Sequence, residues 1–222
     1  PYQPFIECMH VLFGEYETLS CAEFLPPEIY VRLQLVVPQM AQTLVEVAPD
    51  LLDRAIERAA LARRVQAQSE SAHPWAPWQK TLCGSAARSP VPAGVETGWL
   101  FEQFLHLFIA PARQQPLVLL LDDLQWIDPG SAALLFYLAR RLAHSRVLLV
   151  AAYRPGEIHN YAGSGPHPLL GIVTELQRYR GDIRVDLDHV DEQAFVAEFL
   201  EKDPLLSPNC LDAAFRAALA QR

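Results

Sequence analysis

Residues 117–128 read LVLLLDDLQWID, an aliphatic run that ends in a pair of aspartates. Five consecutive aliphatic residues between Pro116 and Asp122 predict a strand that is buried on both faces. A second aliphatic run, VLLVAA at 147–152, predicts another buried strand. Strands that alternate with helices form parallel sheets, so the sequence predicts an α/β fold in which helices flank a parallel sheet.

A helix is expected between these two strands. Asp128 is a suitable N-cap, and Pro129 suits the first helical position. Leucines follow at helical spacing, and basic residues near the end of the segment complement the helix dipole. We therefore interpret Asp128 as a helix cap rather than a ligand, and Trp126, just before the helix, as a packing residue.

Helices are also expected before the first strand. Residues 3–14 and 99–109 each carry a broad apolar stripe, and the second segment should pack on the sheet. Residues 28–47 predict one or two short helices interrupted at Pro38, because proline removes a helical hydrogen bond.

Between residues 50 and 98 the helical spacing of apolar residues is weaker. Asp50 is a candidate N-cap for a helix that runs to about Arg64. From residue 65 to residue 98 the helical pattern is replaced by Ser, Ala, Pro and Gly with two tryptophans. We interpret residues 65–98 as a long surface loop or insert.

Beyond the second strand, the pattern predicts a helix at 169–179 and a third strand at 183–187. The chain is expected to be helical after Asp191. Two domains follow from this pattern, namely an α/β core at residues 1–188 and the start of a small helical lid at residues 189–222.

Composition and charge exclude several classes of protein. The 222 residues are 51% hydrophobic and 20% charged, and no apolar run approaches the roughly 20 residues of a membrane-spanning helix. The net charge is −8 with scattered basic residues, which argues against direct contact of this segment with nucleic acid. Four widely spaced cysteines and no visible secretory signal indicate a reduced, cytoplasmic environment.

Charged residues follow both predicted strands. In an open parallel sheet, ligands bind beyond the carboxyl ends of the strands. Asp122 and Asp123 follow the first strand, and adjacent carboxylates can hold a hydrated Mg²⁺ and orient a water molecule. Arg154 follows the second strand, and its guanidinium could reach a terminal phosphate. The alternative is that the acidic pair merely carries the chain from the core to solvent.

The stretch PLVLLLDDLQWIDPGSAALLFYLARRL, with the later VLLVAAYRP, resembles the Walker B and sensor 1 segments of the STAND class of P-loop ATPases. It is most similar to the subgroup related to Orc1-like AAA ATPase domains, found in large LuxR-type transcription regulators and beside some bacterial nucleotide cyclases and protein kinases. The similarity covers residues 99–200. More weakly, PYQPFIECMHVLF resembles the helix after strand 2 of this family, and DLDHVDEQAFVAEFL resembles its entry into the helical lid.

The resemblance implies a role for three side chains. Asp122 would assist Mg²⁺ coordination through water, Asp123 would position the attacking water, and Arg154 would sense the γ-phosphate of ATP. It also implies that residues 1–188 are a partial P-loop NTPase-like core whose ligands in the intact protein are ATP and Mg²⁺.

One motif of the family is missing from this sequence. A phosphate loop needs Gly-x-x-x-x-Gly-Lys-Ser/Thr, so that backbone N–H groups and the lysine surround the phosphates. The lysines are Lys80 and Lys202, and neither follows a glycine. The family places this loop before the segment that begins at Pro1. We therefore expect the chain to be a piece of a longer polypeptide, with an incomplete sheet that lacks the Walker A strand.

Two functions remain open on the sequence. The first is an ATP-dependent signalling switch in a multidomain regulator, whose partners would be ATP, other domains of the same chain and, on activation, other copies. It includes the case of an ATPase segment attached to a nucleotide cyclase or a protein kinase. The second is a non-catalytic interaction scaffold that retains the nucleotide-binding fold. Under both hypotheses, residues 1–222 alone are expected to be inactive.

Overall fold

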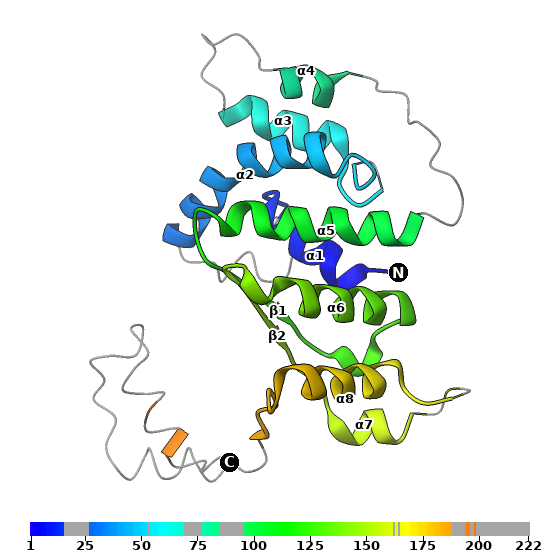
Figure 1. Ribbon diagram of the computed structural model, residues 1–222. Coiled ribbons are helices and arrows are strands. Elements are labelled where there is room, and N and C mark those ends of the chain that lie inside the picture. The colour runs from blue at the N-terminus through cyan, green and yellow to red at the C-terminus, as the bar shows by residue number, and fades with distance from the viewer. Residues whose placement is uncertain are drawn as a thin grey trace. The chain divides into compact units, whose positions relative to one another are not determined.

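The computed structural model describes residues 1–15, 27–52, 54–68, 77–84, 96–161, 163, 165–187, 194–195 and 198. The chain divides into two compact units, Pro1–Tyr179 and Arg180–Arg222. The first unit holds the sheet and the helices around it (Figure 1). The expected helical lid at 189–222 lies almost wholly outside the described residues.

The sheet contains strands β1 (Leu117–Leu121) and β2 (Val147–Ala151), which pair in parallel. Helix α6 (Pro129–Arg141) connects them and continues into a short 3-10 helix, η4 (Leu142–His144). Both expected strands and the expected helix between them are confirmed. The result is the predicted parallel βαβ unit, with the carboxyl ends of both strands at one edge.

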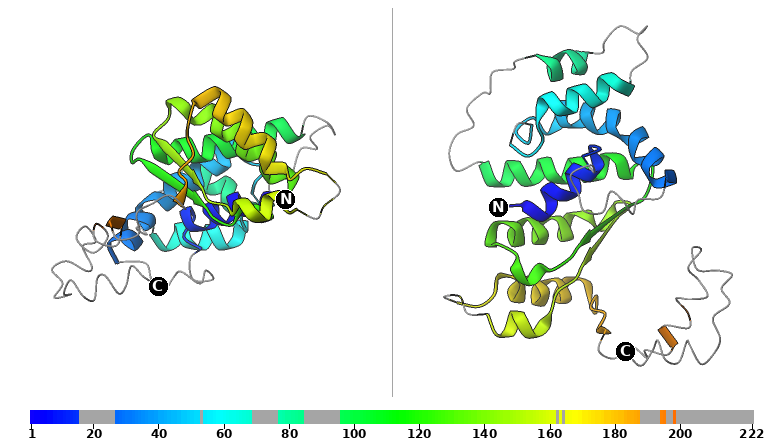
Figure 2. Two further views of the ribbon diagram at one scale, coloured as in Figure 1. Left: turned by 90° about the horizontal axis from the view of Figure 1, so that it is seen from below. Right: turned by 180° about the vertical axis from the view of Figure 1, so that it is seen from behind.

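Within the described ranges of the chain, helices cover one face of this sheet and leave the other uncovered. Leu119 and Leu121 are 3% and 2% exposed and face the helices. Between them, Val118 and Leu120 are 59% and 64% exposed, so the expectation of burial on both faces is wrong. The described helices pack on one side only, as the two views in Figure 2 also indicate. We call the uncovered side the open face, and its residues are Val118, Leu120, Leu148 and Val150.

Residues 183–187 do not form a strand, contrary to expectation. Ile183, Val185 and Leu187 alternate as in a strand but are 53%, 79% and 76% exposed. A strand needs a neighbour to pair its backbone N–H and C=O groups. In the part of the chain that the structure describes, the sheet consists of β1 and β2, and residues 183–187 pair with neither strand.

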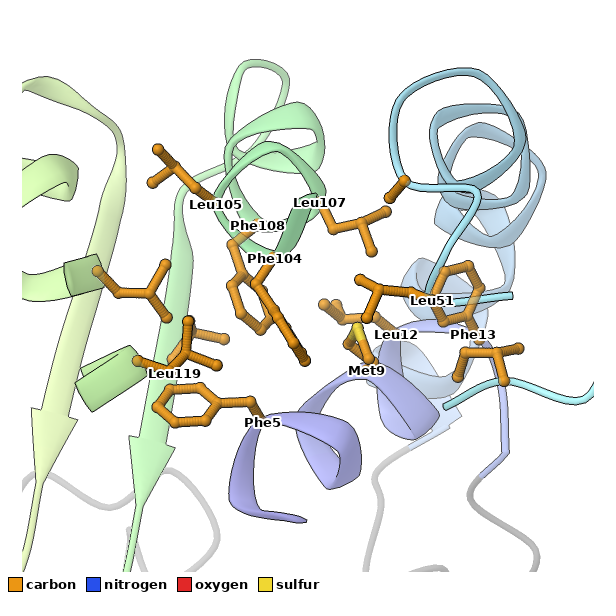
Figure 3. Packing of buried hydrophobic residues seen from close by; sticks show 14 of the residues in the cluster. Phe5, Met9, Leu12, Phe13, Leu51, Phe104, Leu105, Leu107, Phe108 and Leu119 are labelled. Atoms are coloured by element: carbon orange, nitrogen blue, oxygen red, sulfur yellow. The ribbon is translucent and has the colours of Figure 1, made fainter. Parts of the chain in front are cut away.

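The covered face packs on helix α5 (Glu96–Ala112), which contacts both strands and also α6. Helix α1 (Gln3–Leu12) contacts α6 from the other end of the chain. Figure 3 shows Phe5 and Met9 of α1 beside Phe104 of α5 and Leu119 of β1. These side chains are at most 3% exposed, so α5 packs on the sheet as the sequence predicted.

Helix α2 (Pro27–Val47) is continuous through Pro38, so the expected interruption is wrong. An interior proline costs a helix about 3 kcal/mol. Residues on both sides of Pro38 are fully buried, including Val37, Met40 and Leu44. Since burial of one such side chain contributes about 1.5–3 kcal/mol, packing outweighs the proline.

The helix expected after Asp50 begins later. Helix α3 is Arg58–Gln68, and the Asp50 carboxylate instead accepts hydrogen bonds from the side chains of Trp99 (2.9 Å) and Gln103 (2.7 Å). The interpretation of 65–98 as a loop is also corrected in part. Helix α3 extends into this segment, helix α4 (Pro77–Cys83) lies within it, and α5 begins before its end.

Three further elements follow the strands along the chain. The 3-10 helix η3 (Leu124–Trp126) follows β1, and helix α7 (Pro155–His159) follows β2. Helix α8 (Pro168–Arg180) confirms the helix expected at 169–179. Among the described residues, we find no helix with the length and apolarity needed to cross a membrane.

The N-terminus of α6 is capped by Asp128, as predicted. Its Oδ1 accepts hydrogen bonds from the backbone N–H groups of Gly130 (2.9 Å) and Ser131 (3.0 Å), and its Oδ2 accepts one from the Ser131 hydroxyl. The Ser131 hydroxyl in turn accepts the Tyr2 N–H at 2.8 Å, which ties the start of the chain to α6. Partial burial raises the pKa of Asp128, but these hydrogen bonds outweigh it and hold the pKa below its usual value.

Replacing Asp128 by alanine should destabilise residues 1–222 by about 0.5–2 kcal/mol at pH 7, because the cap is lost. A depressed folded-state pKa contributes stability above the unfolded pKa, and that stability is lost as pH falls through the folded pKa. The difference from the parent should therefore shrink in acid. Urea unfolding at pH 7 and below pH 4 measures this, and a difference that grows in acid would contradict it.

Candidate functional site

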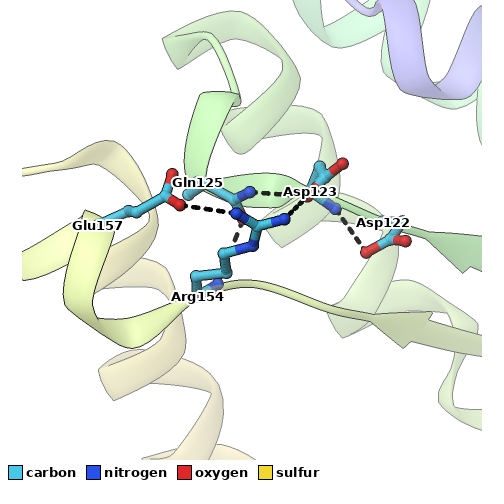
Figure 4. A network of polar contacts seen from close by, with 5 residues as sticks. All are labelled: Asp122, Asp123, Gln125, Arg154 and Glu157. Atoms are coloured by element: carbon cyan, nitrogen blue, oxygen red, sulfur yellow. Dashed lines mark hydrogen bonds and ion pairs between the residues drawn. The ribbon is translucent and has the colours of Figure 1, made fainter.

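The parallel pairing brings the expected site residues to one edge of the sheet. Past the strand ends, the Ala152 N–H donates to the Leu121 carbonyl (2.8 Å), and the Leu124 N–H donates to the Ala152 carbonyl (3.0 Å). These bonds hold the two chain segments together. Asp123 and Arg154 consequently lie side by side, with Asp123 Oδ1 3.8 Å from Arg154 Nη2 (Figure 4).

Asp122 and Asp123 form a tight turn out of β1. The Oδ1 of Asp122 accepts the backbone N–H of Asp123 at 2.7 Å. The backbone of Asp123 is left-handed, with φ 54° and ψ 36°, a conformation that aspartate tolerates better than most residues. This turn starts η3 and directs the Asp123 carboxylate toward the end of β2.

Gln125 is a member of the site that the sequence did not single out. Its side chain is buried, and its Nε2 donates to Asp123 Oδ1 at 2.7 Å. Its Oε1 accepts the backbone N–H of Arg154 at 3.2 Å. A polar side chain within an otherwise apolar 3-10 turn is the one signal that could have indicated it.

Arg154 is engaged by two carboxylates. Its Nη1 lies 3.0 Å from Glu157 Oε1, in addition to the longer contact with Asp123. The Arg154 side chain is 65% exposed, so these ion pairs contribute little stability and can be exchanged for others. Glu157 was also missed, although the i, i+3 spacing after Pro155 is a known signal for such pairs.

The buried side chain of His167 supports the backbone of the site. It is 3% exposed, and its Nε2 contacts the Gln125 carbonyl at 2.8 Å. Its Nδ1 accepts the Leu169 N–H at 3.1 Å. A carbonyl can only accept and a backbone N–H can only donate, so both contacts are satisfied together by the neutral ring with its proton on Nε2. His167 thus joins η3 to the start of α8.

An open hollow of ≈ 810 Å³ lies beside Arg154, with Trp126, Asn160 and Tyr161 among its lining residues. Trp126 is 69% exposed, so the interpretation of this side chain as a packing residue is wrong. The hollow leaves room for a ligand next to the guanidinium.

The acidic pair suits a hydrated magnesium ion rather than a protein cage. Among the described residues, no group of three or more His, Cys, Asp or Glu side chains could hold a metal. Asp122 is exposed, and its Oδ1 is used by the Asp123 N–H. Its other oxygen can reach a cation through water, and Mg²⁺ keeps several waters and binds through one or two carboxylates. The residues present therefore fit the ion.

The family model of the AAA ATPase domain matches residues 21–150. This match spans more than half of the chain and includes β1, both aspartates, Gln125 and α6. The chain belongs to the AAA ATPase domain family. No curated protein and no solved structure matches it. Arg154 and His167 lie beyond the matched residues of this AAA ATPase domain. Membership supports a nucleotide-binding function of the ATPase type.

Proposed function

We propose that this AAA ATPase domain is part of an ATP-dependent switch of the STAND type within a multidomain regulator of transcription. The single observation that carries the proposal is the cluster of Asp123, Gln125 and Arg154 at the carboxyl edge of a parallel sheet. A carboxylate that can orient water and a guanidinium that can reach a phosphate are two of the groups that phosphoryl transfer to water uses.

Each side chain has a proposed task. Asp123 orients the attacking water, and its carboxylate accepts a proton from that water as the new phosphorus–oxygen bond forms and the bond from the γ-phosphorus to the bridging oxygen breaks, which releases ADP. Arg154 leaves Glu157 and compensates the charge on the γ-phosphate. Asp122 would hold one water of a hydrated Mg²⁺. That ion, when bound, neutralises charge on the phosphate oxygens.

The contacts of Arg154 support a switch rather than a constitutive enzyme. The Arg154 guanidinium pairs with the carboxylates of Glu157 and Asp123. A terminal phosphate would compete for the same N–H groups and would free the Asp123 carboxylate. Hydrolysis would restore the original pairs, so the site has two charge arrangements that nucleotide can select between.

The phosphate loop is proposed to lie in a longer polypeptide, before the segment that begins at Pro1. One observation favours a second candidate, a non-catalytic interaction scaffold, because residues 1–222 contain no Gly-x-x-x-x-Gly-Lys-Ser/Thr motif. The coding sequence upstream of Pro1 distinguishes the two. A phosphate loop there, together with MgATP hydrolysis by the longer polypeptide, supports the switch, whereas a start codon near Pro1 supports the scaffold.

Residues 1–222 alone should not bind MgATP. Asp122 and Asp123 repel a polyanion, and the N–H donors and lysine that would offset its charge are missing from the sequence. A ligand at 100 times its dissociation constant stabilises a protein by about 2.7 kcal/mol, so thermal unfolding in millimolar MgATP is a sensitive measurement. We expect no shift in Tm. A rise in Tm that disappears in Arg154→Ala would contradict this expectation.

A further inference from the structure

We propose that Gln125 is a positioning residue, whose buried carboxamide fixes the Asp123 carboxylate and the Arg154 backbone relative to each other. Its effect on catalysis rests on the function proposed above. The positioning of Asp123 and Arg154 by Gln125 does not depend on that function and can be tested on residues 1–222.

The nitrogen and the oxygen of the Gln125 carboxamide bind different residues. The Nε2 group donates to Asp123 Oδ1 (2.7 Å), and Oε1 accepts from the Arg154 N–H (3.2 Å). One planar group therefore spans the residues that follow β1 and β2 (Figure 4). Gln125 is only 4% exposed, so water cannot easily replace either partner.

The backbone of Gln125 is anchored as well. Its carbonyl accepts from the buried His167 at 2.8 Å, and the preceding Leu124 N–H donates to Ala152 at 3.0 Å. The carboxamide therefore projects from a fixed turn, not from a mobile loop. Such support from neighbouring groups is what keeps a reactive side chain within the narrow geometry that catalysis needs.

This bond also decides which Asp123 oxygen is available. In the described part of the chain, Gln125 and Arg154 both contact Oδ1 of Asp123. The carboxylate is held with Oδ2 free to accept a hydrogen bond from water. Without Gln125, the carboxylate could rotate toward the Arg154 guanidinium and pair with it through both oxygens.

Gln103 provides a matched control on α5. It is 1% exposed, its Nε2 donates to Asp50 Oδ2 at 2.7 Å, and its Oε1 accepts the Asp50 N–H at 3.1 Å. Gln103 thus makes the same two kinds of bond, but to other residues. Gln103→Met and Gln125→Met should destabilise the fold to a similar extent, which separates loss of stability from loss of positioning.

The first experiment is backbone amide hydrogen exchange by NMR on residues 1–222. Gln125→Met should raise the exchange rate of the Arg154 amide roughly fivefold to tenfold, since its acceptor is lost. Gln103→Met should instead raise exchange at Asp50 and leave Arg154 unchanged. Gln125→Glu retains the acceptor and should leave Arg154 protected. An unchanged Arg154 exchange rate in Gln125→Met would overturn the proposal, whatever the protein's activity.

The second experiment measures MgATP hydrolysis by the longer polypeptide that carries a phosphate loop. Gln125→Met and Gln125→Glu should each lower kcat about 100-fold, with KM within about twofold of the parent, because a misplaced reacting group acts on the chemical step. Gln103→Met should keep the parental kcat. Parental kcat in both Gln125 variants would overturn the catalytic part. If the parent polypeptide does not hydrolyse MgATP, the proposed function is refuted. Hydrogen exchange at Arg154 would still test whether Gln125 positions Asp123 and Arg154.

Discussion

Asp123→Asn is expected to lower the rate of ATP hydrolysis by the longer polypeptide about 10²–10⁴-fold, the usual contribution of a general base. ATP binding should change little. Charge at the attacking water acts mainly in the transition state, whereas contacts with the phosphates supply ground-state binding. Steady-state hydrolysis together with the Kd for MgATP measures both quantities.

Apart from the lost charge, Asp123→Asn should change the structure of the site little. Asparagine has the same shape, tolerates the left-handed backbone at position 123 and can still accept the bond from Gln125. Asp50→Asn is the matched control, since the Asp50 carboxylate likewise accepts a hydrogen bond from a glutamine side chain, Gln103 (2.7 Å), and lies outside the proposed site. It should hydrolyse ATP at the parental rate. If Asp123→Asn does so too, Asp123 is not the catalytic base.

Much of the site could be predicted because parallel strands bring their carboxyl ends together. Asp122, Asp123 and Arg154 each lie within two residues of the end of an aliphatic run, so their proximity required only the pairing of β1 and β2. Gln125 could not be predicted in the same way. Its role depends on the left-handed backbone of Asp123 and on a 3-10 turn that swings the carboxamide back toward β2. Neither feature has a strong local sequence signal.

In the fold as well, features that depend on neighbouring residues in the chain were predictable, and features that depend on distant residues were not. The cap at Asp128 and helix α6 were predictable because the responsible residues are neighbours in the chain. The continuity of α2 through Pro38 was not, because it depends on side chains of other elements that bury Val37 and Met40. Aliphatic alternation at 183–187 indicates that a segment suits a sheet, but it says nothing about whether a neighbouring strand is present.

Leu119→Ala is expected to destabilise residues 1–222 by about 2–5 kcal/mol, and Leu120→Ala by less than about 0.5 kcal/mol. These adjacent leucines on β1 differ mainly in burial, because Leu119 is 3% exposed and faces Phe5 and Phe104, whereas Leu120 is 64% exposed on the open face (Figure 3). Alanine at 119 leaves a cavity in the core. Alanine at 120 removes atoms that already contact solvent. The free energy of unfolding in urea, with CD detection, measures both variants.

The pair of variants also tests the open face itself. A parallel sheet is usually covered on both sides, so four exposed aliphatic side chains on β1 and β2 are unusual. If Leu120→Ala costs as much as Leu119→Ala, the open face is covered in solution. If the destabilisation by Leu120→Ala becomes smaller when the protein is diluted, a second copy covers the open face, because the stability of an associated state depends on concentration. A cost independent of concentration would indicate that the chain's own residues pack there, and the one-sided sheet described above would be wrong.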